Sequence, residues 1–174
     1  MARSQQPAAG RADPRQDCPW TDLPADGSTL TIEAFVTFAL ARLGDAGQRN
    51  ITARYLAAFD LKLTEWRLLA ALAEFSPAPF GQLVSVSSSD KALVSRTLRT
   101  LVDNGMARTE RDPANPKKLI ASITDSGRRL YQRVMPVAQR AQAEVLLQLN
   151  EADRVALYHL LRKLQDAMDL SRAS

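Results

Sequence analysis

Residues 61–124 decide the fold, and they read LKLTEWRLLAALAEFSPAPFGQLVSVSSSDKALVSRTLRTLVDNGMARTERDPANPKKLIASIT. Apolar residues recur at three- and four-residue spacing in three separate runs, a period that is typical of amphipathic helices. We expect the first helix to be capped by Thr64, to carry Glu65 at the positive end of its dipole, and to end before Pro77. A short second helix is expected over 80–86 and a third over 91–104.

The residues on either side of the third helix predict how it begins and how it ends. The run Ser-Ser-Ser-Asp at 87–90 favours N-cap positions, and Gly105 suits the left-handed residue just past a helix end. Strand-like segments at 106–111 and 119–123 enclose turn-forming residues at 112–117, which predict a hairpin with a long, basic tip. Three helices and then such a hairpin are the layout of a winged helix-turn-helix.

The flanking sequence predicts more helix and a flexible end. Residues 1–28 are rich in Ala, Pro, Gly, Asp, Gln and Arg without any period, so we expect a flexible arm. Helical spacing returns at 30–45, at 125–149, where Thr124 precedes as a cap and Pro136 is expected to bend the helix, and again up to about residue 170. The fold class is mainly α with a small β-hairpin wing.

Composition limits the class of protein. The chain has 174 residues, 45% of them hydrophobic and 24% charged, which is ordinary for a globular protein. It has no apolar run long enough to span a membrane and no apolar signal-peptide core near its start, so we expect a cytoplasmic protein without a membrane partner.

Two residues that carry chemistry occur only once each. Cys18 is the only cysteine and His159 the only histidine, and His159 lies in a stretch with the spacing of an amphipathic helix. Zinc sites and acid–base catalysis usually need several such side chains, and the sequence contains no glycine-rich phosphate loop. We therefore expect no enzyme activity, no metal site and no cofactor.

The charge distribution indicates a polyanionic partner. Nine Lys and Arg stand against six Asp and Glu between 61 and 124, although a basic surface also serves solubility. An α-helix fits the major groove of B-DNA, and its N-terminal residues contact the bases. The side chains that the third helix leaves for DNA, together with two lysines at the hairpin tip, are Ser88, Ser89, Asp90, Lys91, Ser95, Arg96, Arg99, Lys117 and Lys118.

At this point the sequence resembles the multiple-antibiotic-resistance regulator (MarR) family, from about residue 30 to residue 170. The order and spacing of five segments carry the resemblance. They are LTEWRLLAAL at 63–72, DKALVSRTL at 90–98, LVDNGM at 101–106, RDP at 111–113 and ITDSG at 123–127.

The resemblance implies a homodimer that reads a pseudo-palindromic promoter site in double-stranded DNA, usually as a repressor, and that a small aromatic or lipophilic effector releases. It also implies that Ser95 and Arg96 contact DNA from the recognition helix and Lys117 from the wing. Phe35, Leu157, Leu161 and Leu164 would then be covered by the partner. The expected parts are an arm at 1–28, a dimerisation helix and linker at 29–60, a winged helix-turn-helix at 61–124 and dimerisation helices at 125–174.

The wing departs from the family pattern. Where the family commonly has Asp-x-Arg, with the Arg in the minor groove, this chain has Asn115-Pro116-Lys117. Lysine is a compact, strongly hydrated charge that lacks the planar fork of arginine. We therefore expect weaker readout of minor-groove shape, with more of the specificity carried by the recognition helix.

The effector site has the weakest sequence signal. The candidate lining residues are Phe35, Phe38, Phe59, Trp66 and Arg67, with Arg67 meeting a carboxylate. The alternative is that no effector binds there. The aromatic residues would then be packed in the core, and Arg67 would lie on the surface. Cys18 lies too far before the first helix to match the oxidation sensors of the family.

Two rival classes remain. A winged-helix module that binds protein rather than DNA shares the fold, and a salt series distinguishes the two because phosphate contacts weaken as salt rises. An enzyme with a helix-turn-helix dimerisation domain is disfavoured by the scarcity of catalytic residue types.

Overall fold

The computed structural model describes residues 18–87 and 89–170, and the chain divides into two compact units after Gly47. In the first unit a 3-10 helix η1 (Ile32–Ala34) precedes helix α1 (Val36–Gly47). The helix predicted over 30–45 is therefore two pieces, because Phe35 between them has an extended backbone. The Trp20 indole N–H donates to the Ala34 carbonyl at 2.7 Å. Residues 1–17 of the predicted arm lie outside the described residues.

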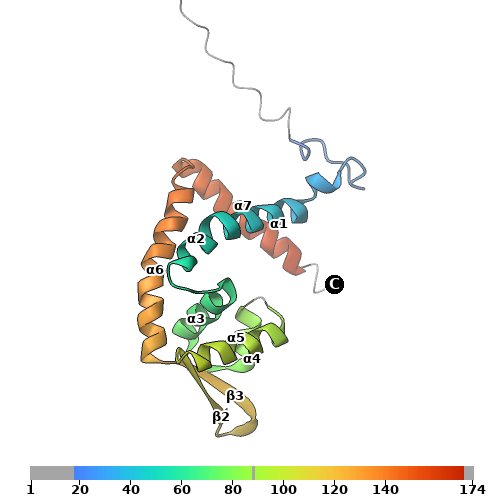
Figure 1. Cartoon of the computed structure of the whole chain (residues 1–174). Helices are drawn as coiled ribbons and strands as arrows, with labels where there is room; N and C mark the ends of the chain where they lie inside the picture. Colours follow the sequence, from blue (N-terminus) through green and yellow to red (C-terminus); the bar gives the residue numbers. More distant parts are fainter. Residues whose placement is uncertain (1–17, 88, 171–174) are drawn as a thin grey trace, which may run out of the picture. The chain divides into compact units, whose positions relative to one another are not determined.

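The second unit contains the winged helix and the C-terminal helices (Figure 1). Its elements, in chain order, are η2 (Gln48–Thr52), α2 (Ala53–Ala57), α3 (Leu63–Phe75), β1 (Ala78–Pro79), α4 (Phe80–Val86), α5 (Lys91–Asp103), β2 (Ala107–Asp112), β3 (Asn115–Ile123), α6 (Asp125–Leu146) and α7 (Glu151–Leu170). The predicted short helix over 80–86 is confirmed at both ends. The third helix ends one residue earlier than predicted.

Local signals explain how α3 and α5 begin and end. The predicted cap Thr64 is wrong, because α3 already includes Leu63 and the Glu65 carboxylate accepts from the Lys62 backbone N–H at 2.9 Å. At α5, Asp90 is the N-cap and accepts from the Leu93 N–H at 2.8 Å. Gly105 has a φ of +70°, as predicted for the residue past the helix end.

The two long C-terminal helices begin at side-chain caps, the first of which is the predicted Thr124. The Thr124 hydroxyl accepts from the Gly127 N–H at 3.1 Å, and the Asn150 side chain accepts from the Asp153 N–H at 2.9 Å. Pro136 lies inside α6, which ends at Leu146, three residues before the predicted end.

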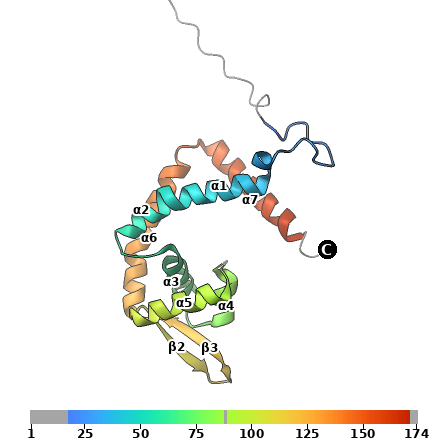
Figure 2. The same cartoon turned by 45° about the vertical axis from the view of Figure 1, so that its right-hand side comes forward.

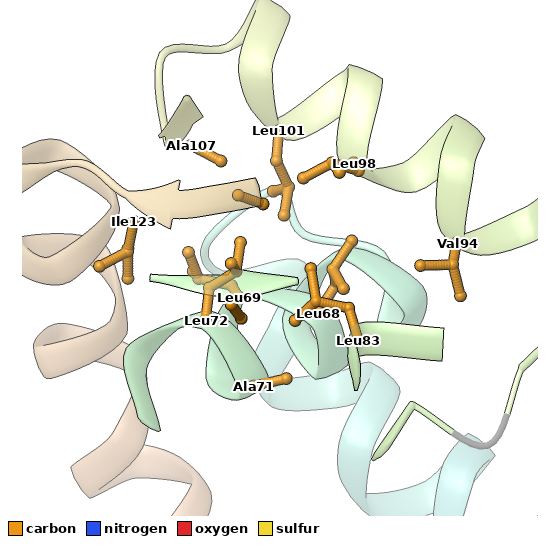
Figure 3. Close-up of a cluster of buried hydrophobic side chains, with 12 residues drawn as sticks. Leu68, Leu69, Ala71, Leu72, Leu83, Val94, Leu98, Leu101, Ala107 and Ile123 are labelled. Carbon is orange, nitrogen blue, oxygen red and sulfur yellow. The ribbon is translucent and has the colours of Figure 1, made fainter. Parts of the chain in front are cut away.

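Two buried clusters hold the second unit together. The larger one joins α3, α4, α5 and the sheet, and Figure 3 shows Leu68, Leu69 and Leu72 of α3 close to Leu98 and Leu101 of α5. The smaller one joins α2, α3 and α6 through four buried residues, which are Leu56, Trp66, Val134 and Ala138. Helix α3 contributes to both clusters. It therefore connects α5, which packs in the larger cluster, to α2 and α6, which pack in the smaller one.

The sheet has three strands rather than the two that the sequence predicted, in the order β1-β3-β2 and antiparallel throughout. Ala78 pairs with Ala121, Arg111 with Leu119, and Asp112 with Asn115. Residues 116–118 of β3 consequently bulge opposite the step from Arg111 to Asp112. Pro116 lacks the N–H that a regular ladder requires, which fits a bulge at this position.

The predicted long tip of the hairpin is therefore wrong. The turn contains only Pro113 and Ala114, and the Asp112 carboxylate accepts from the Ala114 N–H at 2.8 Å. Lys117 and Lys118 lie in the bulge of β3 rather than at the tip.

Candidate nucleic-acid interface

Helix α5 presents one polar, basic face. Lys91, Ser95, Arg96 and Arg99 are exposed, at the four- and three-residue steps that share a helix face. The opposite face carries four buried residues, which are Val94, Thr97, Leu98 and Leu101. The core therefore holds the helix so that three cations and one hydroxyl point to solvent.

The residues just before α5 have local roles in the structure. The Ser89 hydroxyl donates to the Ser87 carbonyl at 3.1 Å, and the Ser87 hydroxyl donates to the Val84 carbonyl at 3.2 Å. Asp90 is the helix cap. Ser88, another predicted DNA contact, lies outside the described residues. Lys91 follows these residues and is the first predicted DNA contact along the chain with an exposed, cationic side chain.

The wing adds cations at the same end of the unit, where both views show α5 and the β2–β3 hairpin together (Figure 2). Lys117 and Lys118 are exposed and line one groove with Lys91. Arg108 and Arg111 of β2 are exposed as well. Sequence reasoning did not name these two arginines, although their place in a predicted wing strand was an available signal.

A second groove lies between α3 and the end of α4 and has a volume of about 450 Å³. Trp66 and Arg67, two of the predicted effector residues, line it together with Glu74, Phe75 and other residues of α3 and the end of α4. Trp66 is buried and stacks on Tyr131 with ring centroids 5.7 Å apart. This groove joins an exposed guanidinium to aromatic surface, a combination that suits an aromatic acid.

The other predicted effector residues are not part of that groove's lining. Phe59 packs against the smaller core cluster, and the Arg133 guanidinium lies 5.8 Å from the centre of its ring. Phe35 and Phe38 belong to the first unit, where both are exposed. Glu74 is a lining residue that sequence reasoning missed, because only the packing of α4 against α3 creates the groove.

The described residues contain neither a membrane-spanning helix nor a cluster of metal ligands. Between 18 and 170, with residue 88 excepted, no helix combines the length and apolarity of a membrane span. Over the same residues no three His, Cys, Asp or Glu side chains are grouped as metal ligands would be. His159 is exposed, and its ring meets Tyr158 edge-on at 5.6 Å.

Comparisons with known proteins agree with this geometry. A family model described as the MarR family matches residues 59–115. The HTH-type transcriptional repressor NicR of Pseudomonas putida is 28% identical over 127 residues, which cover 72% of this chain and 80% of NicR. Transcriptional regulator HosA of Escherichia coli O111:H- is 23% identical over 62% of this chain and 80% of HosA.

Solved structures show the same architecture. BpsR of Bordetella bronchiseptica, whose DNA binding is regulated by 6-hydroxynicotinic acid, has a TM-score of 0.68 at 26% identity, with 79% of this chain and 97% of BpsR covered. MepR of S. aureus, solved in complex with DNA, has a TM-score of 0.70 at 15% identity over 76% of this chain and 98% of MepR, which shows the fold. The chain is thus similar over residues 59–115 to the MarR family, and it has the winged helix-turn-helix fold of solved transcriptional regulators such as BpsR.

Proposed function

We propose that this regulator is a homodimeric, ligand-responsive repressor that binds a pseudo-palindromic promoter site. The observation that carries the proposal is the exposed face of α5, where Lys91, Ser95, Arg96 and Arg99 stand on a helix held by a buried core. In such an arrangement the helix enters the major groove, where arginine reads guanine through its two parallel N–H donors. A DNA partner implies that the protein works in the cytoplasm.

The wing supplies the second set of contacts in this proposal. Lys117, Lys118, Arg108 and Arg111 meet the phosphates beside the major-groove site. Phosphate contacts fix the register of the protein on the duplex and carry no sequence information of their own. The bases are therefore read mainly by Ser95, Arg96 and Arg99. Ser89 and Asp90 shape the start of the helix, and Asp90, as an anion, does not face a phosphate.

Exposed apolar surface on the C-terminal helices supports the homodimer. Tyr158, Leu160 and Leu161 of α7 are 62%, 58% and 44% exposed, and Leu147 before it is 68% exposed. Several large apolar side chains left exposed on one helix mark an interaction site. A second copy that covers it also brings a second α5 to the DNA, and two-fold symmetry of the protein matches a pseudo-palindrome.

The effector is proposed to be a small aromatic acid bound beside Trp66 and Arg67. BpsR, at 26% identity, is regulated by such an acid. Val86 and Ser87 line the same groove, and the Ser87 carbonyl accepts from the Ser89 hydroxyl, next to the Asp90 cap of α5. A ligand that moves Ser87 therefore acts on the first turn of the DNA-reading helix.

Selection of bound sites from random duplex DNA tests the proposal. We expect a palindrome whose half-sites lie about one helical turn apart, and binding to it that weakens linearly with salt on logarithmic axes. Failure to enrich any sequence, together with binding that does not respond to salt, would favour a winged-helix module that recognises protein.

A further inference from the structure

We propose that an acidic N-terminal segment, residues 18–34, packs in one copy of the chain against the middle of α7 in a second copy. Residues 18–29 precede the part of the chain that resembles the MarR family. BpsR is matched over 97% of its own length by 79% of this chain, so about a fifth of this chain has no counterpart in BpsR. The inference rests on the homodimer of the proposed function and names a further contact within it.

Hydrogen bonds hold the N-terminal segment in a defined conformation. The Trp20 indole N–H donates to the Ala34 carbonyl at 2.7 Å and so ties the start of the segment to its end. Between them the chain turns at Gly27, which has a φ of +65° and whose N–H donates to the Pro24 carbonyl at 2.9 Å. A segment that is already ordered loses less conformational entropy when it docks on a partner.

The surface of the N-terminal segment is apolar and acidic. Trp20 and Leu23 are about half exposed, and Ile32 is more exposed still. Tryptophan is enriched among the residues that dominate the binding energy of protein interfaces. The segment contains three carboxylates and no Lys or Arg. The three, all exposed, are Asp22, Asp26 and Glu33. A surface that fits this segment therefore combines apolar side chains with cations.

The middle of α7 has that combination. Residues 154–163 contain three cations and no Asp or Glu, and the four carboxylates of α7 lie on either side of this stretch. Two of the cations, Arg162 and Lys163, are exposed and follow directly after the exposed Leu160 and Leu161. A second copy thus brings three carboxylates of one chain to three cations of the other. Complementary charge selects which surfaces meet and fixes their register.

Cross-linking tests the contact, because Cys18 is the only cysteine and is exposed at the start of the segment. The wild-type chain is mixed with a Cys18→Ser/His159→Cys chain that carries a longer tag, and a short bis-maleimide is added after the subunits have exchanged. His159 is exposed and lies about one helical turn before Arg162 and Lys163. We expect a covalent product that contains one copy of each chain. Cys18→Ser/Gln132→Cys, with its new cysteine at an exposed position of α6, is the matched control and should give no such product.

Analytical ultracentrifugation of the same samples distinguishes failure of this contact from failure of the proposed function. A dimer that gives no mixed product overturns the contact and leaves the homodimer standing. A chain that stays monomeric refutes both. A chain that carries Cys18 together with His159→Cys and cross-links only within itself would mean that the segment covers α7 of its own chain, which also overturns the proposal.

Charge reversal tests the complementarity itself. Asp22→Lys/Glu33→Lys makes cations of one copy face cations of the other, and it should raise the dimer Kd at least about tenfold. Adding Arg162→Glu/Lys163→Glu to the same chain restores opposite signs across the contact. The four changes together should return the Kd to within about threefold of the wild-type value, as expected for groups that interact.

The matched control for this rescue is Arg128→Glu/Arg129→Glu, at two exposed positions of α6. Combined with Asp22→Lys/Glu33→Lys, it restores the net charge of the chain equally well and should leave the loss of dimer affinity in place. Equal rescue by the two pairs would mean that only net charge matters, and the contact with α7 would be refuted.

Discussion

Helices α3 and α7 share an amphipathic pattern but differ in what covers their apolar faces. In α3, Leu68, Leu69 and Leu72 are buried by α5, α4 and the sheet of the same chain. In α7, Leu160 and Leu161 are 58% and 44% exposed. A helical period therefore predicts that a face will be buried without saying which chain will bury it. The winged helix carries its own core, and α7 requires a partner in the proposed dimer.

The largest expected effect is on the free energy of unfolding, and it tests whether α3 is buried within its own chain. Leu69→Ala removes a fully buried side chain from the core cluster and should lower the free energy of unfolding by about 2–5 kcal/mol. Leu161→Ala is the matched change on α7. Thermal unfolding over a range of protein concentrations separates them, since Leu69→Ala should lower the Tm at every concentration. A shift for Leu161→Ala that does not depend on concentration would show that α7 is covered within its own chain.

The next effect tests the face that requires a partner. Leu161→Asp places a charge in the proposed dimer interface and should raise the dimer dissociation constant at least about a hundredfold, or about 2.7 kcal/mol. Analytical ultracentrifugation and DNA binding should report the loss together. Gln165→Asp, at a position of the same helix that is already polar and exposed, is the control. A Leu161→Asp chain that stays monomeric and binds the selected site at full strength contradicts the two-fold proposal.

A smaller effect is expected on the DNA-reading surface, which the core positions but does not bury. Arg96→Ala should weaken binding to the selected site by about 1–3 kcal/mol if the guanidinium meets a base edge, and should relax specificity at one base position. Arg140→Ala removes the same charge from an exposed position of α6 and is the control. Equal losses in the two variants would mean that Arg96 contributes only to the general charge.

The same contrast between local and long-range order explains what the sequence could predict. The three helices of the winged helix were predictable from their helical spacing, and α5 has local end signals as well, the Asp90 cap and Gly105 with its positive φ. Strand β1 was not, because its two residues become a strand only by pairing with β3, as Ala78 does with Ala121. The bulge that places Lys117 and Lys118 beside Lys91 depends on the register of β2 against β3, which no local pattern encodes.

The candidate site divides in the same way. The exposed face with Ser95, Arg96 and Arg99 was predictable, because a polar stripe opposite an apolar one on a single helix needs only the helical period. The groove beside Trp66 and Arg67 was predicted in part, and its other wall at Val86 comes from the packing of α4 on α3. Phe59 was assigned to the groove because an aromatic residue in a core and one in a ligand site look alike in sequence.

The smallest expected effect concerns the cap that makes α5 independent of any partner. Asp90→Ala removes the acceptor of the Leu93 N–H and should cost about 1 kcal/mol of unfolding free energy. Asp90→Asn keeps an acceptor of the same shape without the charge and should restore most of it. Because this bond lies within the winged helix, the loss should be the same in the wild-type background and in Leu161→Asp, as measured by denaturant unfolding of both. A cap effect that vanishes in Leu161→Asp would mean that the partner chain orders the start of α5. The winged helix would then depend on the dimer as much as α7 does.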